Sequence, residues 1–96
     1  MNKAQILSEL KKFKSAHQQE YGLEVLGIFG SYARDEANNE SDVDIVVQLV
    51  KQDLFSMIGI KQDLEDILHL PVDVVSYRPN MNFPLKKHID RDAIYV

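Results

Sequence analysis

Apolar residues recur along this chain with two different periods, and the change of period separates helices from strands. Over about residues 2–19 the apolar positions follow helical spacing, and Gly22 is typical of the residue just past a helix. The following run, residues 23–29, is almost continuously apolar, which is typical of a strand covered on both faces. The pattern therefore predicts an amphipathic helix followed by a buried strand.

A second strand is predicted at residues 43–50, after a short helix over residues 31–37 and a turn at Asn38-Asn39. Its side chains alternate in character, so that one face is apolar and the other is mixed. We expect the apolar face to join the core and the mixed face to form a functional site. The apolar face carries Val43, Ile45, Val47 and Leu49, and the mixed face carries Asp42, Asp44, Val46 and Gln48.

The second half of the chain repeats the order of helix and strand. Residues 53–70 carry an apolar stripe at helical spacing, and residues 72–75 form a third short strand after a proline. Residues 77–83 have the composition of a loop, and a last helix is predicted from Pro84 to about residues 94–96. The order αβαβαβα predicts an α/β fold.

The pairing of the strands follows from the positions of their polar residues. The Gly30-Ser31 turn follows the end of the first strand, whereas two aspartates open the second. For these ends to meet, the first two strands must run antiparallel. The long helix before the third strand suits a parallel crossover, which brings Asp73 beside Asp42 and Asp44. We therefore expect a mixed β-sheet flanked by helices, with three aspartates near the turn.

These residues together have the chemistry of a nucleotide and metal site. Gly30 lets the backbone approach an anion, and Ser31 adds a hydroxyl and an N–H at a helix start, where phosphate is favoured. Carboxylates on one face of a strand suit a pair of hard cations, and magnesium prefers oxygen ligands. We expect two Mg²⁺ ions on Asp42, Asp44 and Asp73, with Asp73 also a candidate base for the acceptor's proton.

Each piece of this pattern also has a purely structural explanation. A lone D-x-D pair is common at strand ends, and a Gly-Ser turn after a strand needs no ligand. Asp44 and Asp73, however, stand among valines and isoleucines, where an unpaired carboxylate would be costly. The joint pattern therefore favours the nucleotide site. Arg34, one helical turn beyond Ser31, is a weaker candidate for contact with the same phosphates.

Composition excludes several other classes of protein. The 96 residues carry 11 basic and 15 acidic side chains, a net charge of −4, so direct binding to nucleic acid is not expected. There is no cysteine, which removes disulfides and cysteine-ligated metal sites. No apolar run approaches the roughly 20 residues that span a bilayer, and no signal-peptide pattern is present. We expect a cytoplasmic protein.

Three short segments carry a resemblance to a known family: residues 30–34 (GSYAR), residues 40–45 (ESDVDI) and residues 72–75 (VDVV). They resemble the nucleotidyltransferase domain of the DNA polymerase β superfamily and, more narrowly, the minimal nucleotidyltransferase (MNT) domain. The combination of Gly-Ser, D-x-D and a third aspartate is specific to the superfamily, whereas the single pieces are not. The resemblance implies the polymerase β-like nucleotidyltransferase fold in a single domain over residues 1–96.

The resemblance also implies a reaction and a partner. It implies two magnesium ions on Asp42, Asp44 and Asp73, and transfer of a nucleoside monophosphate from a nucleoside triphosphate. Stand-alone MNT proteins of this size are commonly encoded beside a HEPN-domain ribonuclease toxin. They act as its antitoxin and can transfer AMP from ATP to a tyrosine of the toxin. The family often has glycine after the arginine, where this chain has Asp35, and we expect only a local effect at the helix end.

Two other functions are compatible with the same residues. A non-catalytic antitoxin would neutralise its partner by binding and masking it, with the site vestigial or regulatory. A small-molecule nucleotidyltransferase, such as one that modifies an aminoglycoside, would usually add a domain that holds the acceptor, for which 96 residues leave no room. The leading hypothesis is therefore an AMP-transferring antitoxin whose acceptor lies on a partner protein.

Overall fold

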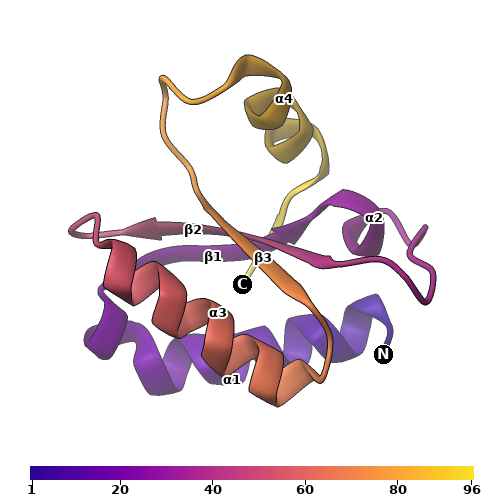
Figure 1. Cartoon of the computed structure of the whole chain (residues 1–96), viewed down its shortest axis with the longest axis horizontal. Helices are drawn as coiled ribbons and strands as arrows, with labels where there is room; N and C mark the ends of the chain where they lie inside the picture. Colours follow the sequence, from indigo (N-terminus) through magenta and orange to yellow (C-terminus); the bar gives the residue numbers. More distant parts are fainter.

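The computed structural model describes all 96 residues and folds them around one four-stranded sheet (Figure 1). Helices α1 and α3 lie against one face of the sheet, α4 stands over the other face, and the short α2 lies at one end. None of the helices has the length and apolar content to cross a membrane. The elements are α1 (Lys3–Tyr21), β1 (Leu23–Phe29), α2 (Gly30–Ala33), β2 (Val43–Leu49), α3 (Leu54–Leu68), β3 (Val72–Ser76), α4 (Phe83–Asp92) and β4 (Ile94–Tyr95).

The sheet is mixed, and its strand order is β3-β2-β1-β4. β1 and β2 are antiparallel, whereas β2 and β3 are parallel and joined by the α3 crossover. Both predicted pairings are confirmed. Because β2 has a neighbour on each side, a residue near its start meets the end of β1 and the start of β3.

Short-range hydrogen bonds set the helix ends. At the start of α1, the Asn2 side chain accepts from the Gln5 N–H and the Asn2 N–H donates to the Gln5 side chain, both at 2.9 Å. Gly22 ends α1 in the left-handed conformation, with φ of 64°. Asp53 caps α3 by accepting from the Phe55 N–H at 3.0 Å. These caps explain why both long helices begin and end close to the predicted residues.

The main core lies between the sheet and the layer formed by α1 and α3. It joins the apolar face of β2 to one stripe of each helix, as predicted. A smaller cluster of Phe29, Val46 and Ile89 lies on the opposite face, beneath α4. The face predicted to form a site is therefore partly covered by a helix. Fully buried members of the main core include Ile6, Leu10, Leu26, Ile28, Ile45, Ile60 and Leu64.

β1 is covered on both faces only in its second half. Glu24 is exposed and Val25 is half-buried, whereas residues 26–29 are buried. The prediction that both faces are covered is wrong for the first half of the strand, because α4 packs only over the other half.

Two segments differ from the sequence prediction. α2 ends at Ala33 instead of residue 37, because Asp35 takes a φ of 60° that does not continue a helix. The last residues form β4, paired with β1, and are not the end of the last helix. α4 stops because Ala93 is extended, with ψ of 137°. A strand of two residues is too short to show a period in the sequence.

Gly27 makes room for β4 at the edge of the sheet. A Cβ atom at this position would lie only 2.6 Å from the Ile94 carbonyl oxygen, which is closer than real atoms approach. The glycine in β1 is therefore required by the fourth strand.

Candidate functional site

Strand register gathers the predicted site residues at one end of the sheet. Asp44 on β2 pairs with Phe29 at the end of β1 and with Asp73 on β3. Gly30 and Ser31 follow directly after Phe29 and begin α2. The turn and the two aspartates therefore meet because β2 is the strand that lies between β1 and β3.

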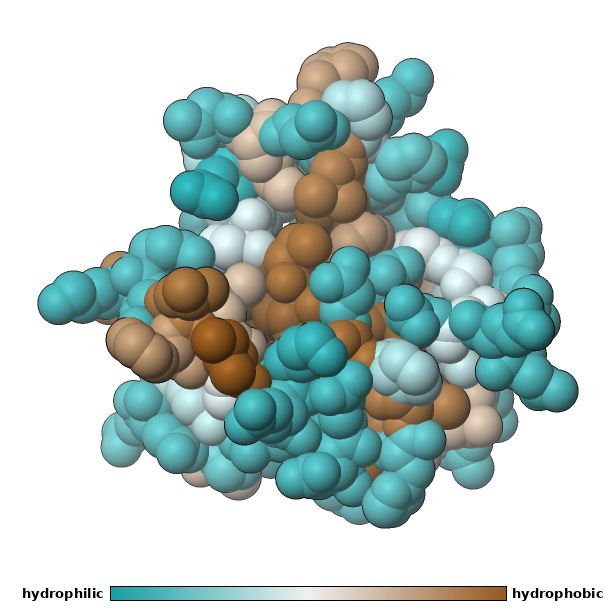
Figure 2. Space-filling view, viewed as in Figure 1, coloured by the Kyte–Doolittle hydropathy of each residue, from teal (hydrophilic) through white to brown (hydrophobic).

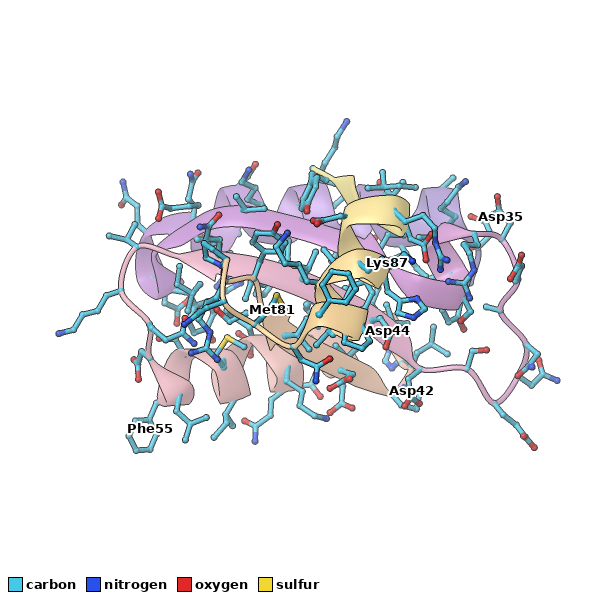
Figure 3. All side chains as sticks on the ribbon, turned by 90° about the horizontal axis from the view of Figure 1, so that it is seen from above. Asp35, Asp42, Asp44, Phe55, Met81 and Lys87 are labelled. Atoms are coloured by element: carbon cyan, nitrogen blue, oxygen red, sulfur yellow. The ribbon has the colours of Figure 1, made fainter.

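All three aspartates lie on the α4 side of the sheet. Asp44 alternates with Ile45, a member of the main core, and shares its face with Val46 beneath α4. Asp42 lies just before β2, and Figure 3 shows it close to Asp44. Asp73 shares the face because it is paired in register with Asp44. The α1 and α3 layer therefore supports the site from behind and does not cover it.

Gly30 brings the turn into contact with Asp44. Its φ of 73° lies in the left-handed region, where glycine is favoured over other residues. A Cβ atom at this position would lie 3.1 Å from the Asp44 Cγ, and still closer to its Oδ2. A side chain here would have to displace the Asp44 carboxylate, so the backbone that opens α2 lies directly beside that carboxylate.

The carboxyl of Asp44 is affected by its burial and by its two acidic neighbours. Asp44 is half-buried, and its burial raises the pKa of its carboxyl above the usual range. The negative charges of Asp73 and Asp42 raise this pKa further, whereas the charge of Arg34 lowers it. The end of the sheet is therefore a region of concentrated negative charge that a cation would stabilise.

Asp73 is less enclosed than the sequence suggests. The flanking valines predict that both Asp44 and Asp73 are embedded, but Asp73 is exposed. The prediction is wrong for Asp73 because β3 is the last strand of the sheet, and only one of its sides is covered by a neighbouring strand. The cost of burying a carboxylate therefore applies to Asp44 and not to Asp73.

The donor set fits a hard divalent cation. Its oxygens all come from carboxylates, which Mg²⁺ prefers, and after burial the charges of Asp73 and Asp42 also raise the pKa of Asp44. No group of three or more His, Cys, Asp or Glu side chains is gathered tightly enough to hold a metal ion in this arrangement. Side-chain rotation at the exposed Asp42 and Asp73 would therefore accompany binding.

Arg34 is held by α4 and by its own loop. Its Nη1 donates to Asp92 at 2.7 Å and its Nε donates to Glu36 at 3.1 Å. Asp92 also accepts from Arg91, and these hydrogen bonds lower the pKa of its almost fully buried carboxyl to about 2. Arg34 and Asp92 lie 58 positions apart, so sequence spacing could not have indicated Asp92 as a partner.

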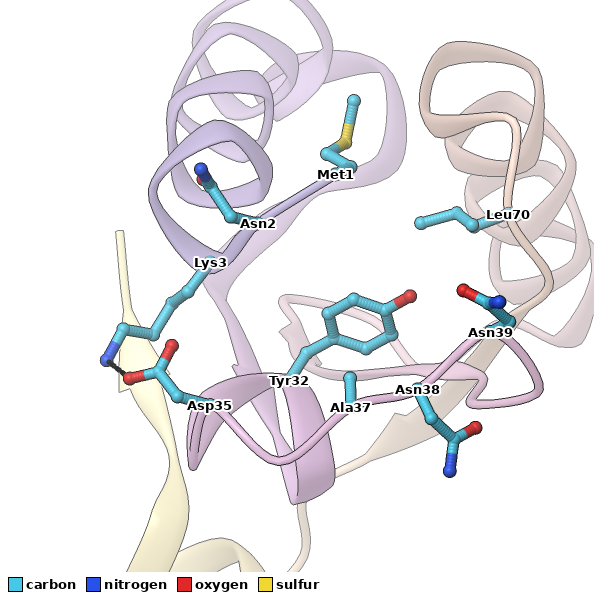
Figure 4. A pocket seen from close by; sticks show the side chains of 9 residues that line it. All are labelled: Met1, Asn2, Lys3, Tyr32, Asp35, Ala37, Asn38, Asn39 and Leu70. Atoms are coloured by element: carbon cyan, nitrogen blue, oxygen red, sulfur yellow. Dashed lines mark hydrogen bonds and ion pairs between the residues drawn. The ribbon is translucent and has the colours of Figure 1, made fainter.

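A separate hollow of about 370 Å³ lies beside α2, next to the start of α1 (Figure 4). Tyr32 packs its ring in the main core and turns its hydroxyl toward Asn39 in this hollow. Lys3 and Asp35 form an ion pair of 2.9 Å at its rim. Asp35 has a left-handed φ, the conformation that glycine adopts most easily, and it lies just past the end of α2. Its effect on the backbone is therefore local to this helix end, as expected. None of the three site aspartates lines this hollow.

Comparison with known proteins matches the chain to one family over most of its length. The family described as polymerase β, nucleotidyltransferase matches residues 11–96. A protein adenylyltransferase, MntA, of the archaeon Thermococcus cleftensis is 35% identical over 95 residues, which cover 94% of this chain and 95% of the relative.

Solved structures share the fold. A proposed minimal nucleotidyltransferase superposes with a TM-score of 0.77 at 29% identity, covering 98% of this chain and 95% of the other. The structure of a tri-AMPylated HEPN toxin of Shewanella oneidensis in complex with its MNT antitoxin gives a TM-score of 0.70 at 20% identity, over 97% and 70% of the two chains. The mixed sheet flanked by helices is therefore the fold of minimal nucleotidyltransferases.

Proposed function

Because the chain belongs to the polymerase β nucleotidyltransferase family, we propose that it transfers AMP from ATP to a hydroxyl group of a partner protein. The observation that carries this proposal is the register of β2, which sets Asp44 beside both the Gly30 turn and Asp73. The name of the Thermococcus relative supports a protein as the acceptor.

The partner in this proposal is a HEPN-domain toxin, and the acceptor is one of its tyrosines. This chain is then the antitoxin, and the addition of AMP silences the toxin. The likeness to an MNT antitoxin in complex with an AMPylated HEPN toxin supports this choice of partner. Because the reaction consumes ATP, the protein would act in the cytoplasm, as one nucleotidyltransferase domain.

Each predicted residue has a role in this proposal. Asp42 and Asp44 would be the principal ligands of two Mg²⁺ ions, with Asp73 as the third ligand. When bound, the ions supply positive charge that offsets the triphosphate and activates the attacking oxygen. Gly30 and Ser31 would hold the β- and γ-phosphates through backbone N–H groups and the serine hydroxyl.

The transfer step breaks one phosphoanhydride bond of ATP and forms one phosphoester bond to the acceptor. The acceptor oxygen attacks the α-phosphorus of ATP, and the bond from that phosphorus to the bridging oxygen of the β-phosphate breaks. Pyrophosphate leaves with the electron pair, and the acceptor's proton passes to the Asp73 carboxylate. The exposure of Asp73 supports this role, because a group on another protein can reach it.

Arg34 retains donors for a phosphate while it is held in place. Arginine has five N–H donors, and the two ion pairs use one on Nε and one on Nη1. The guanidinium is therefore oriented by Asp92 and Glu36, with its remaining donors available to the triphosphate.

Incubation with ATP, Mg²⁺ and the HEPN-domain protein encoded in the same genome tests the proposal. We expect the HEPN protein to gain the mass of one or more AMP groups by mass spectrometry. The double variant Asp42→Ala/Asp44→Ala should transfer none. Absence of any mass gain with the wild-type chain, or full transfer by the double variant, would overturn the proposal.

The non-catalytic alternative gives a different result in cells. If the chain neutralised the toxin by masking alone, the double variant would still protect cells that express the toxin. We expect the double variant to form the complex and yet fail to protect. Complex formation measured by co-purification serves as the control for folding.

A further inference from the structure

A groove of about 550 Å³ runs along the outer edge of β3, between α3 and the segment that leads into α4. Asp73 lines the groove at the start of the strand. Ser76 lines it at the other end, where its hydroxyl donates to Gln52 just before α3 at 2.8 Å. The groove therefore follows the length of β3 and is continuous with the candidate site.

The walls of this groove are largely apolar and remain accessible. Leu54 and Ile58 on α3 are 71% and 44% exposed, and Val74, Val75 and Leu85 are further apolar residues of the lining. Figure 2 shows a hydrophobic band over β3 that continues toward α4, with a second hydrophobic group over the start of α3. A groove with mainly apolar walls next to a candidate site is typical of a binding surface.

Phe55 extends the apolar surface beyond the groove, and Met81 adds to the lining itself. Phe55 is 82% exposed, and Figure 3 shows its ring pointing away from the molecule at the start of α3. Met81 lines the groove from the segment before α4. A bound segment would therefore meet apolar side chains on both of its flanks.

The floor of the groove is an unpaired strand edge. The Pro71 carbonyl and the Tyr77 N–H both bond to β2, so the alternate residues 72, 74 and 76 direct their backbone groups outward. The outward N–H of Val72 donates to the Glu65 side chain at 3.1 Å. The outward groups of Val74 and Ser76 have no strand beside them, because β3 is the last strand of the sheet.

We propose that an extended, apolar segment of the acceptor protein binds in this groove as an additional strand on β3. Main-chain hydrogen bonds to Val74 and Ser76 would give the segment its register, and the apolar walls would select its side chains. Because the groove leads to Asp73, the bound segment delivers its acceptor hydroxyl to the base. The inference rests on the proposed function and identifies the surface by which the acceptor is held.

A positive charge at the end of the groove away from Asp73 also constrains the sequence of the bound segment. Arg78 lines the groove and makes no ion pair, whereas Lys61 is bonded to Glu65 at 3.0 Å. An acidic residue of the segment would therefore lie beside Arg78, with the acceptor hydroxyl toward Asp73. These two contacts, one at each end of the groove, fix the direction in which the segment lies along β3.

Two matched pairs of variants test the groove against the HEPN-domain protein. Leu54→Arg places a charge on the wall, and Val50→Arg places the same charge at a residue with 74% exposure that does not line the groove. Ser76→Pro removes one outward N–H at an edge position that tolerates proline, and Ser76→Ala keeps the N–H while losing the hydroxyl bond. Affinity for the HEPN protein and its rate of AMP transfer are measured for all four.

We expect Leu54→Arg and Ser76→Pro to weaken the affinity for the HEPN protein by about tenfold or more, a typical loss when a central interface contact is removed. Val50→Arg should match the wild-type chain, and Ser76→Ala, which keeps the outward N–H, should lose less affinity than Ser76→Pro. The thermal shift of all variants with the ATP analogue AMP-PNP and Mg²⁺ should be unchanged. In the wild-type complex, hydrogen exchange at the Val74 and Ser76 amides should become slower.

The outcomes of these experiments distinguish a failure of the groove inference from a failure of the proposed AMP transfer. Unchanged affinity in both groove variants, or unchanged exchange at the two amides, would overturn the groove even if AMP transfer proceeds. Absent transfer by a wild-type chain that binds through the groove would instead overturn the proposed function. If the groove variants only convert a dimer of this chain to a monomer in sedimentation, the occupant is a second copy and the inference is wrong.

Discussion

Gly30 is the residue at which backbone conformation and site chemistry depend on each other most directly. Its left-handed φ favours glycine, and a side chain at this position would clash with the Asp44 carboxylate. The same position would hold the phosphates in the proposed function. A substitution here should therefore affect stability and activity together.

We predict that Gly30→Ala lowers the free energy of unfolding by about 1–2 kcal/mol, the usual cost of a left-handed conformation for a residue with a Cβ. AMP transfer should fall more than tenfold, because the new methyl group displaces Asp44. Urea unfolding and the rate of transfer check the two effects.

Gly22→Ala is the matched control for this prediction. Gly22 has a similar φ of 64°, but a Cβ there would make only ordinary contacts, such as 3.6 Å to the Val50 Cβ. We expect a comparable loss of stability with transfer preserved in the folded fraction. Equal loss of transfer in both variants would contradict a specific role for Gly30 in the site.

At the scale of elements, α2 and α4 are joined by the carboxylate of Asp92. Arg91 and Arg34 both donate to it and hold its pKa near 2, below the roughly 3.9 of an unfolded aspartate. A lowered pKa contributes stability that is complete above the unfolded value and is lost as the pH falls through the folded value. This contact should therefore weaken between about pH 4 and pH 2.

We predict that Asp92→Asn unfolds at a lower urea concentration than the wild-type chain at pH 7. The difference should shrink below about pH 4 and vanish near pH 2. Urea unfolding at pH 7, 4 and 2 measures it. Asp90→Asn breaks the more exposed pair with Lys86 and should have a smaller effect, since exposed pairs contribute little. A pH-independent difference for Asp92→Asn would contradict the electrostatic explanation.

The long elements could be predicted from the sequence because each repeats its apolar pattern several times. α1, β1, β2 and α3 carry such repeats, and the antiparallel and parallel pairings followed from where the polar residues stand. β4 could not be predicted, because its two residues are held by β1 and by the space at Gly27. The early end of α2 depends on one left-handed residue, Asp35, which the helical pattern does not reveal.

The candidate site could be predicted only in part, because some of its features depend on tertiary packing and not on local sequence pattern. The sequence indicated all three aspartates by their positions in or beside strands. The register places Asp44 and Asp73 at one end of the sheet, and Asp42 lies just before β2 at the same end. The exposure of Asp73 depends on the position of β3 at the edge, which the apolar neighbours conceal. The contact of Arg34 with Asp92 depends on tertiary packing between distant elements.

At the scale of the whole molecule, the proposed metal and nucleotide site would link ligand binding to folding stability through its carboxylates. A ligand that binds only the folded state stabilises it, by about 2.7 kcal/mol at a concentration one hundred times its Kd. The cluster of negative charge at the end of the sheet opposes folding when no cation is present. Mg²⁺ with nucleotide should reverse this effect.

We predict that Mg²⁺ with AMP-PNP raises the melting temperature of the wild-type chain by several degrees and that EDTA abolishes the rise. Asp44→Asn should show no rise, because it removes a ligand. Without Mg²⁺ the same variant should be more stable than the wild type by about 0.5–1 kcal/mol, since it removes a charge that is half-buried. A full rise in Asp44→Asn would contradict its role as a ligand.

Asp44 also protects the chain from folding in the wrong register. A slip of β2 by one residue would turn its entire side-chain pattern over, and Asp44 would enter the apolar layer that now holds Ile45. An unpaired carboxylate in such a layer costs several kcal/mol by order of magnitude, enough to exclude the slipped sheet. The group proposed to hold the metal therefore also makes a competing alignment of the sheet unfavourable.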